Sequence, residues 1–172
     1  IIKKYGTPTM GGILILSTLL ISVLLWSNLK NIYIWITVFS MSSFGFLGFY
    51  DDYIKIINNS SIGLKMYSKI IIQVLISFII VLLIINNLPN EISTILTFPF
   101  FKNLTINMGW LIIPFGIFII VGSSNAVNLT DGLDGLAIVP VMIAGFSLAF
   151  LAYVVGNSIF SNYLQILYIE GS

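Results

Sequence analysis

The sequence predicts an all-α protein, a polytopic transmembrane helical bundle. Apolar residues make up 58% of the 172 residues, charged residues only 8%, and the mean hydropathy is +1.08. These values lie far outside the usual range of a soluble domain. A helix that crosses a hydrocarbon core of roughly 30 Å needs about 20 mostly apolar residues. Five segments approach this length, so we expect about five spans in a single integral membrane domain, residues 1–172.

Each expected span is an apolar run bounded by polar or turn-forming residues. The five spans are expected at Met10–Trp26, Tyr33–Tyr50, Ile70–Ile85, Trp110–Ser124 and Leu136–Gly156. The third and fourth are short, so we expect them to extend into their flanks. The connections are expected at Ser27–Ile32, Asp51–Lys69, Asn86–Gly109 and Asn125–Gly135. The third connection contains ILTFPFF, whose proline and aromatic residues suit an interfacial or re-entrant segment.

The lysine residues predict the orientation in the membrane. In a five-span arrangement, the N-terminus and the second and fourth connections share one side, which carries Lys3, Lys4, Lys55, Lys65 and Lys69. The other side carries Lys30 and Lys102. The excess of lysine places the first side in the cytoplasm by the positive-inside rule. Every aspartate falls on that same side, so we expect acids and bases to converge at the cytoplasmic surface.

Residue types that are absent from the sequence exclude several kinds of chemistry for this chain. It contains neither cysteine nor histidine, which excludes disulfides, thiol nucleophiles, a Ser-His-Asp triad and zinc sites built on those residues. The formal net charge is +1 and no dense basic cluster occurs, so nucleic acid is not an expected partner. Chemistry must therefore depend on carboxylates, lysines, amides or hydroxyls.

The segment GFYDDYIK, residues 48–55, places two adjacent carboxylates at the end of the second span. Adjacent carboxylates near lipid repel each other unless a metal ion or a lysine compensates them. Mg²⁺ is the natural candidate because it prefers hard oxygen ligands, often one or two carboxylates together with phosphates. Asp51 and Asp52 are therefore candidate catalytic residues and candidate metal ligands. The alternative is that they only end the helix in water.

The segment NAVNLTDGLDGLA, residues 125–137, carries polar residues at every third position: Asn125, Asn128, Asp131 and Asp134. On a helix, this spacing places them on successive turns of one broad face. The glycine after each aspartate leaves room for a ligand, or lets the helix break and expose polar backbone groups. Either outcome suits ligand binding. The alternative is that Thr130 or Asp131 only caps the helix that begins near Leu136.

The segment KKYGTPTMGG, residues 3–12, places two lysines before a glycine- and threonine-rich stretch at the edge of the first span. Lysine ammonium groups and free backbone amides suit phosphate oxygens, although the spacing is not that of a P-loop. The alternative is that the lysines anchor the span and the glycines pack helices. Lys65 and Lys69, four residues apart before the third span, carry the same ambiguity.

Together, the three segments predict a cytoplasm-facing site that joins a phosphorylated donor from the cytosol to a lipid acceptor. In this order, they resemble the phospho-N-acetylmuramoyl-pentapeptide-transferase family, a bacterial branch of the polyprenyl-phosphate N-acetylhexosamine-1-phosphate transferases (glycosyltransferase family 4). The paired aspartates and the glycine-rich aspartate segment are shared with the whole superfamily. The stretch GTPTMGG narrows the resemblance to the muramoyl-pentapeptide branch, and the resemblance covers essentially the whole chain.

The resemblance implies transfer of phospho-N-acetylmuramoyl-pentapeptide from its UDP carrier to undecaprenyl phosphate, with Mg²⁺ required and UMP released. The product is the first lipid intermediate of peptidoglycan synthesis, made at the cytoplasmic face of the bacterial inner membrane. By motif, Asp51 and Asp52 match the catalytic pair, which deprotonates the lipid phosphate or supports the metal. Direct attack and a covalent aspartyl-phosphate intermediate both fit these residues. The implied substrate-binding residues are Lys4, Thr9, Lys55, Lys69, Asn128, Asp131 and Asp134.

The sequence also departs from that family. Family members continue with more spans, a further aspartate and a histidine-rich segment, whereas this chain has no histidine and opens on Ile1. We therefore expect a fragment that is inactive on its own. The alternatives are a GlcNAc-1-phosphate transferase for another envelope polymer, a transporter or channel with intramembrane polar groups, and a structural subunit. The oligomeric state, a homodimer included, is left open.

Overall fold

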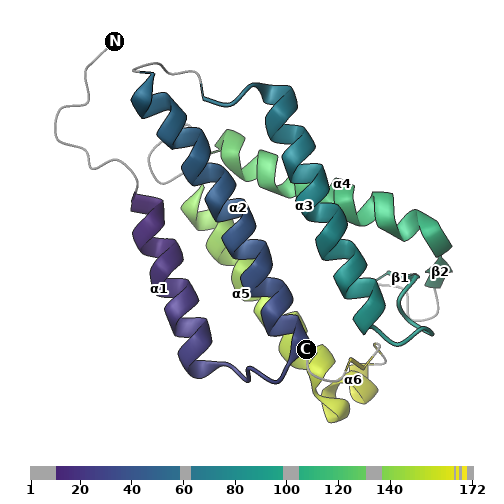
Figure 1. The fold of residues 1–172 in the computed structure, drawn as a ribbon. Coiled ribbons are helices and arrows are strands. Elements are labelled where there is room, and N and C mark those ends of the chain that lie inside the picture. The colour runs from purple at the N-terminus through teal and green to yellow at the C-terminus, as the bar shows by residue number, and fades with distance from the viewer. Residues whose placement is uncertain are drawn as a thin grey trace. The chain divides into compact units, whose positions relative to one another are not determined.

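The computed structural model describes residues 11–58, 63–98, 105–130, 137–164, 166, 168 and 169. In chain order, its elements are α1 (Gly11–Trp26), α2 (Ile32–Ile57), α3 (Met66–Asn87), β1 (Ile95–Thr97), β2 (Thr105–Asn107), the 3-10 helix η1 (Gly109–Leu111), α4 (Ile112–Thr130), α5 (Ile138–Gly156) and α6 (Ser158–Leu164) (Figure 1). The predicted all-α class is confirmed. The chain divides into two compact units, Ile1–Ile80 and Val81–Ser172, which are described separately below.

Four of the described helices are long and apolar enough to cross a membrane. They cover Ile32–Ile57, Met66–Asn87, Gly109–Thr130 and Ile138–Gly156. The described part of the first predicted span, α1, is a shorter apolar helix of 16 residues. At a rise of about 1.5 Å per residue, it is shorter than a hydrocarbon core of roughly 30 Å. The protein is thus a multi-pass membrane protein with four long candidate spans and one shorter apolar helix.

The end of α2 corrects the predicted boundary at Tyr50. The helix continues to Ile57, so the start of the expected connection Asp51–Lys69 is helical. Hydropathy marks where the apolar residues stop, but backbone hydrogen bonds continue as long as the side chains tolerate a helix. Here Lys55 stands in the last turn, where a cation interacts favourably with the helix dipole. The α2 helix therefore carries its polar residues as a projecting helical end rather than as a loop.

The first unit contains an antiparallel pair of helices, α1 and α2, joined by a short turn (Figure 1). The turn is stabilised locally, because the Asn31 side chain caps α2 by accepting the backbone N–H of Tyr33 at 2.9 Å. Close packing depends on Gly45, since a Cβ there would come nearer than 3.0 Å to the Leu16 side chain. A small residue at this contact lets the two helix backbones approach each other.

The second unit contains a short antiparallel hairpin that the sequence did not predict. Strands β1 and β2 pair in the register Ile95 with Asn107 and Thr97 with Thr105. The Asn107 side chain accepts hydrogen bonds from the Thr94 hydroxyl at 3.0 Å and from the Gly109 backbone N–H at 2.9 Å. Strands of three residues are too short for an alternating pattern to be recognised in sequence. The hairpin occupies part of the connection for which we expected an interfacial or re-entrant segment.

Helix α4 extends beyond Ser124 to Thr130, as expected for a short span, so the connection begins after Thr130 rather than at Asn125. Polar side chains at this end bond to the helix itself: Asn125 Nδ2 donates to the Val121 carbonyl and Thr130 Oγ1 to the Val127 carbonyl, both at 2.8 Å. Such local bonds let polar residues remain helical. Thr130 is therefore not the cap of the next helix, since α5 follows Ala137 without a side-chain cap.

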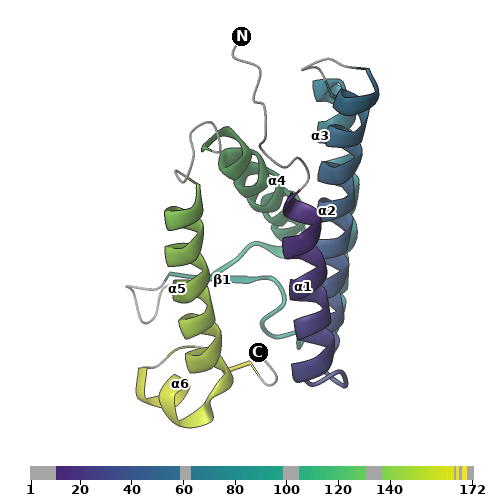
Figure 2. The ribbon, with the colours of Figure 1, turned by 90° about the vertical axis from the view of Figure 1, so that its left-hand side faces the viewer.

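A short unpredicted helix, α6, follows α5 (Figure 2). Asn157 separates the two helices, with an extended backbone of φ −104° and ψ 115°. Its side-chain oxygen accepts the backbone N–H groups of Ile159 at 2.9 Å and Phe160 at 3.3 Å. This capping arrangement satisfies donors that a helix N-terminus leaves unpaired. The chain therefore turns at Asn157 instead of extending α5.

Candidate functional site

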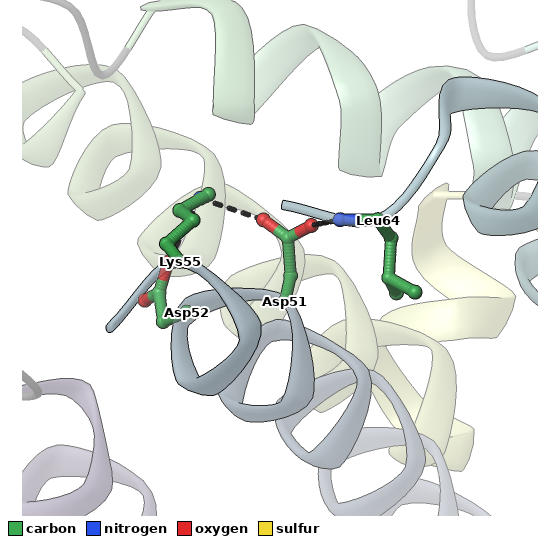
Figure 3. Close-up of polar contacts among 4 residues, drawn as sticks. All are labelled: Asp51, Asp52, Lys55 and Leu64. Carbon is green, nitrogen blue, oxygen red and sulfur yellow. Dashed lines mark hydrogen bonds and ion pairs between the residues drawn. The ribbon is translucent and has the colours of Figure 1, made fainter. Parts of the chain in front are cut away.

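The paired aspartates lie on the last two turns of α2, and Asp51 is the buried member of the pair. Its side chain is 11% exposed. Asp51 Oδ2 forms an ion pair with Lys55 Nζ at 2.6 Å, and Oδ1 accepts the backbone N–H of Leu64 at 2.8 Å (Figure 3). Because a buried carboxylate needs partners, this arrangement lets Asp51 remain charged. Asp51 therefore joins the end of α2 to the segment that precedes α3.

Asp52 occupies a different environment, although it is the next residue. Its side chain is 57% exposed, and its Oδ1 atom lies 2.9 Å from Lys55 Nζ. Lys55 thus contacts both carboxylates, from the i+4 position of Asp51 and the i+3 position of Asp52. Its positive charge offsets the repulsion between the two aspartates. The sequence predicted that either a lysine or a metal ion would do this. The site presents one accessible carboxylate beside a lysine.

The segment before α3 approaches this cluster closely at Gly63. A Cβ on Gly63 would come nearer than 3.0 Å to Asp51 Oδ1 and lie 2.8 Å from both Asp51 Cγ and Lys55 Cε. Any larger residue would therefore displace the Asp51 carboxylate, the Lys55 side chain or the backbone. Sequence reasoning missed both Gly63 and the Leu64 amide. A glycine ahead of a helix is a weak signal of close approach, and a backbone amide has no signature in the sequence.

An apolar cavity borders the exposed aspartate. The cavity measures about 660 Å³ and lies between α1 and α2. Its lining includes Leu16, Leu19, Phe46 and Phe49, and it reaches Asp52. Because α2 is a candidate membrane span, the cavity combines a lipid-compatible surface with a carboxylate at the polar end of the helix. This combination suits a molecule with an apolar chain and a polar head.

The other predicted site residues are only partly described. Lys69 lies on the first turn of α3. Asn125 and Asn128 lie three residues apart on α4, and Asn128 is exposed. These two residues belong to the second compact unit. Lys4, Thr9, Asp131 and Asp134 lie outside the described residues. The structure therefore brings together Asp51, Asp52 and Lys55.

Mg²⁺ fits the donor chemistry of this cluster in part. Asp52 is an exposed hard-oxygen donor, whereas both Asp51 oxygens already have partners. Within the residues that the structure describes, no group of three or more acidic, histidine or cysteine side chains could hold a metal ion. Mg²⁺ commonly uses only one or two protein carboxylates and takes its other ligands from phosphates and water. One carboxylate plus substrate phosphates would therefore suffice for binding.

The helices and the cluster define an integral membrane protein with a carboxylate and lysine site at the polar end of a candidate spanning helix. Comparison with known protein families identifies the family within this class. The glycosyl transferase family 4 model matches residues 34–170, and the chain belongs to this family. Residues 4–16 match the phospho-N-acetylmuramoyl-pentapeptide-transferase signature 1. The family resemblance predicted from the three sequence segments is confirmed.

A curated relative carries the same name as that signature. The phospho-N-acetylmuramoyl-pentapeptide-transferase of Pelagibacter ubique (strain HTCC1062) is 56% identical over 171 residues, which are 99% of this chain and 47% of the relative. The chain thus spans about half the length of the curated relative that it matches. For this reason, the substrates and the activity predicted from the sequence are proposed below for the whole protein and not for this chain alone.

Proposed function

We propose that the whole protein transfers phospho-N-acetylmuramoyl-pentapeptide from a UDP carrier to undecaprenyl phosphate, releases UMP and forms the first lipid intermediate of peptidoglycan. The signature at residues 4–16 and the 56% identity to a relative of that name support this function. The structural observation that carries it is the accessible Asp52 carboxylate beside Lys55 at the edge of an apolar cavity. A lipid phosphate requires an apolar surface for its chain and charged residues for its phosphate group.

The proposed reaction joins two phosphate-bearing anions, so electrostatic compensation and positioning supply most of the catalysis. Lys55, held between the two aspartates, provides a positive charge beside the exposed carboxylate. In this proposal, Asp52 accepts a proton from the lipid phosphate or interacts with a bound cation. Lys69 adds a second positive charge near Asp51. The lysines can thus attract an anionic head group, while Asp52 accepts its proton or holds a bound cation beside it.

We propose Mg²⁺ as the cofactor, with Asp52 as the protein ligand among the described residues. Bound there, the ion would neutralise phosphate charge and orient the reacting oxygens. Lys55 would remain outside its coordination, because an ammonium group repels a cation. Removal of Mg²⁺ by a chelator should therefore abolish transfer, and added Mg²⁺ should restore it.

We propose that this site faces the cytoplasm, where the UDP-linked donor is made. The lysine distribution along the sequence supports this orientation. A single cysteine introduced by Asp52→Cys should react with a membrane-impermeant maleimide only from the cytoplasmic side. Labelling from both sides would instead favour a transport pathway through the protein.

Donor competition tests the proposed reaction. The complete protein, reconstituted with undecaprenyl phosphate and Mg²⁺, should form a lipid product and UMP from UDP-N-acetylmuramoyl-pentapeptide. UDP-GlcNAc, supplied at the same concentration, should give no lipid product. The opposite preference would replace the proposed function by GlcNAc-1-phosphate transfer for another polymer. No product with either donor would leave the structural-subunit alternative.

A further inference from the structure

The turn between α1 and α2, residues 27–31, is flanked by exposed apolar side chains (Figure 1). Trp26 ends α1 and is 82% exposed, and Trp35, on the first turn of α2, is 47% exposed. Leu29 and Ile32 lie between them in the chain and are also exposed. An exposed apolar surface of this kind marks contact with a membrane or with another protein. The position of the turn and its hydrogen bonds favour the membrane.

The length of α2 places this turn at a membrane surface. The turn directly precedes Ile32, the first residue of α2, and the first charged residue of that helix is Asp51. At a rise of about 1.5 Å per residue, these two residues lie roughly 28 Å apart along the helix, which is close to the thickness of a hydrocarbon core. Because the charged end of α2 lies at one surface of the membrane, the turn lies at the opposite surface.

Several polar groups of the turn are bonded within the turn itself or to the end of α1. Asn28 Oδ1 accepts the backbone N–H of Lys30 at 3.2 Å, and the Asn28 carbonyl accepts that of Asn31 at 2.9 Å. The Val23 carbonyl accepts the backbone N–H of Ser27 at 3.0 Å and also the Ser27 hydroxyl. Polar groups that are satisfied locally tolerate a layer that is poor in water. The turn can therefore enter the head-group layer without leaving these donors unpaired.

Trp35 has the arrangement expected of a residue at the boundary between water and lipid. Its indole Nε1–H donates to the Leu29 carbonyl at 2.9 Å, while about half of the residue remains exposed. Tryptophan is enriched at this boundary because its ring is apolar and its N–H is polar. Lys30, within the turn, is exposed and charged, and a charge is costly in hydrocarbon. The turn therefore lies in the boundary layer and not in the hydrocarbon core.

We propose that the α1–α2 turn forms a contact surface for phospholipid, in which Trp26 and Trp35 lie in the head-group layer at the membrane surface opposite the charged end of α2. The partner is the phospholipid bilayer itself, at the boundary between acyl chains and head groups. A protein interface of ordinary size contains about ten hydrogen bonds, whereas several polar groups of this turn are already paired within the chain. The proposal concerns lipid contact alone and is independent of the proposed reaction.

Fluorescence quenching at two depths tests this position. The complete protein is reconstituted in phosphatidylcholine that carries bromine either close to the head group or deep in the acyl chains. Two variants keep only Trp26 or only Trp35 and have phenylalanine in place of every other tryptophan. The shallow bromine should quench both tryptophans at least about twofold more strongly than the deep bromine, because the head-group layer is where tryptophan lies in an interfacial segment.

Two outcomes of this measurement would overturn the proposal. Stronger quenching by the deep bromine would place the turn within the hydrocarbon core. Quenching by neither lipid would show that protein or bulk water, and not phospholipid, covers the two tryptophans. The matched control is Phe39→Trp as the only tryptophan, since this exposed position lies about 10 Å further along α2 than Ile32. The deep bromine should quench this control more strongly.

A single substitution decides the matter if the variants with one tryptophan do not accumulate in the membrane. Trp26→Phe keeps an apolar ring and leaves every other tryptophan in place. The emission lost between the wild type and this variant belongs to Trp26, and its quenching by the two brominated lipids can be compared directly. This component should be the more sensitive to the shallow bromine. Equal sensitivity to the two lipids, or none, would contradict a position in the head-group layer.

Discussion

The polar ends of α2 and α4 show two ways of keeping polar residues at the end of an apolar helix. At the end of α2, Asp51 and Lys55 pair with each other, and Asp51 also bonds to a distant backbone amide. At the end of α4, Asn125 and Thr130 donate to carbonyls of their own helix, and Asn128 is exposed. The first region is therefore organised before any substrate binds. The second offers the exposed amide of Asn128 to a ligand.

The difference suggests different contributions to the proposed reaction. A preorganised charged cluster stabilises charge that develops during the reaction, because its groups need no reorganisation at that moment. An exposed amide can contribute binding energy that is the same before and during the reaction. Substitutions in the α2 cluster should therefore lower kcat, and substitutions on α4 should raise KM.

The largest effect is expected from Asp52→Asn in the complete protein. It removes the exposed negative charge of the α2 cluster but keeps the shape of the side chain, so kcat should fall by roughly 1,000-fold or more. Lipid product formation under saturating donor measures this loss. Glu91→Gln makes the same chemical change at an exposed residue outside the cluster and should keep full activity. Activity of Asp52→Asn within tenfold of the wild type would contradict the role proposed for this carboxylate.

A smaller loss is expected from Lys55→Ala. It removes the cation between the aspartates, so kcat should fall about 100-fold, comparable with the loss of one charge-stabilising donor. The side chains of Asp51 and Asp52 would then repel each other without compensation. Lys30→Ala, in the turn between α1 and α2, removes the same charge elsewhere in this unit and should leave kcat unchanged. An unchanged kcat in Lys55→Ala would show that the α2 cluster is not preorganised for catalysis.

A third, smaller effect is expected from Asn128→Ala on α4. The KM for the UDP-linked donor should rise about tenfold with kcat nearly constant, which is the kinetic sign of lost uniform binding. Steady-state kinetics with varied donor measure both constants. Asn90→Ala removes an amide from the connection after α3 and serves as the control with no expected effect. A fall in kcat at constant KM would remove the distinction between the two regions.

The smallest difference is expected in stability without substrate. Asp51→Ala leaves the Leu64 N–H without its acceptor and leaves Lys55 with Asp52 alone, so the free energy of unfolding should fall on the order of 1 to 3 kcal/mol. Thr130→Ala loses one exposed local hydrogen bond and should cost less than about 0.5 kcal/mol. Denaturant titration in detergent micelles compares the two variants. Equal losses would mean that the contacts of Asp51 do not stabilise the fold.

Sequence reasoning found much of this protein because the strongest signals are local. Long apolar runs predicted the helices, and the segment 48–55 located the charged cluster. The boundary at Tyr50 was wrong because hydropathy falls where polar residues begin, whereas α2 continues to Ile57. The short fourth span extends into its flank as expected, and α4 ends at Thr130. The hairpin and α6 were missed because elements of three to seven residues have no reliable periodic pattern.

The sequence by itself determined the membrane class, the family and the residue types available for chemistry, since composition and short motifs carry that information without a fold. Only the tertiary structure decided how the two adjacent aspartates differ. Their identical side chains cannot reveal which one is buried, because burial depends on a segment 13 residues away. Gly63 and the Leu64 amide act through space, and so the inequality of Asp51 and Asp52 is a property of the folded chain alone.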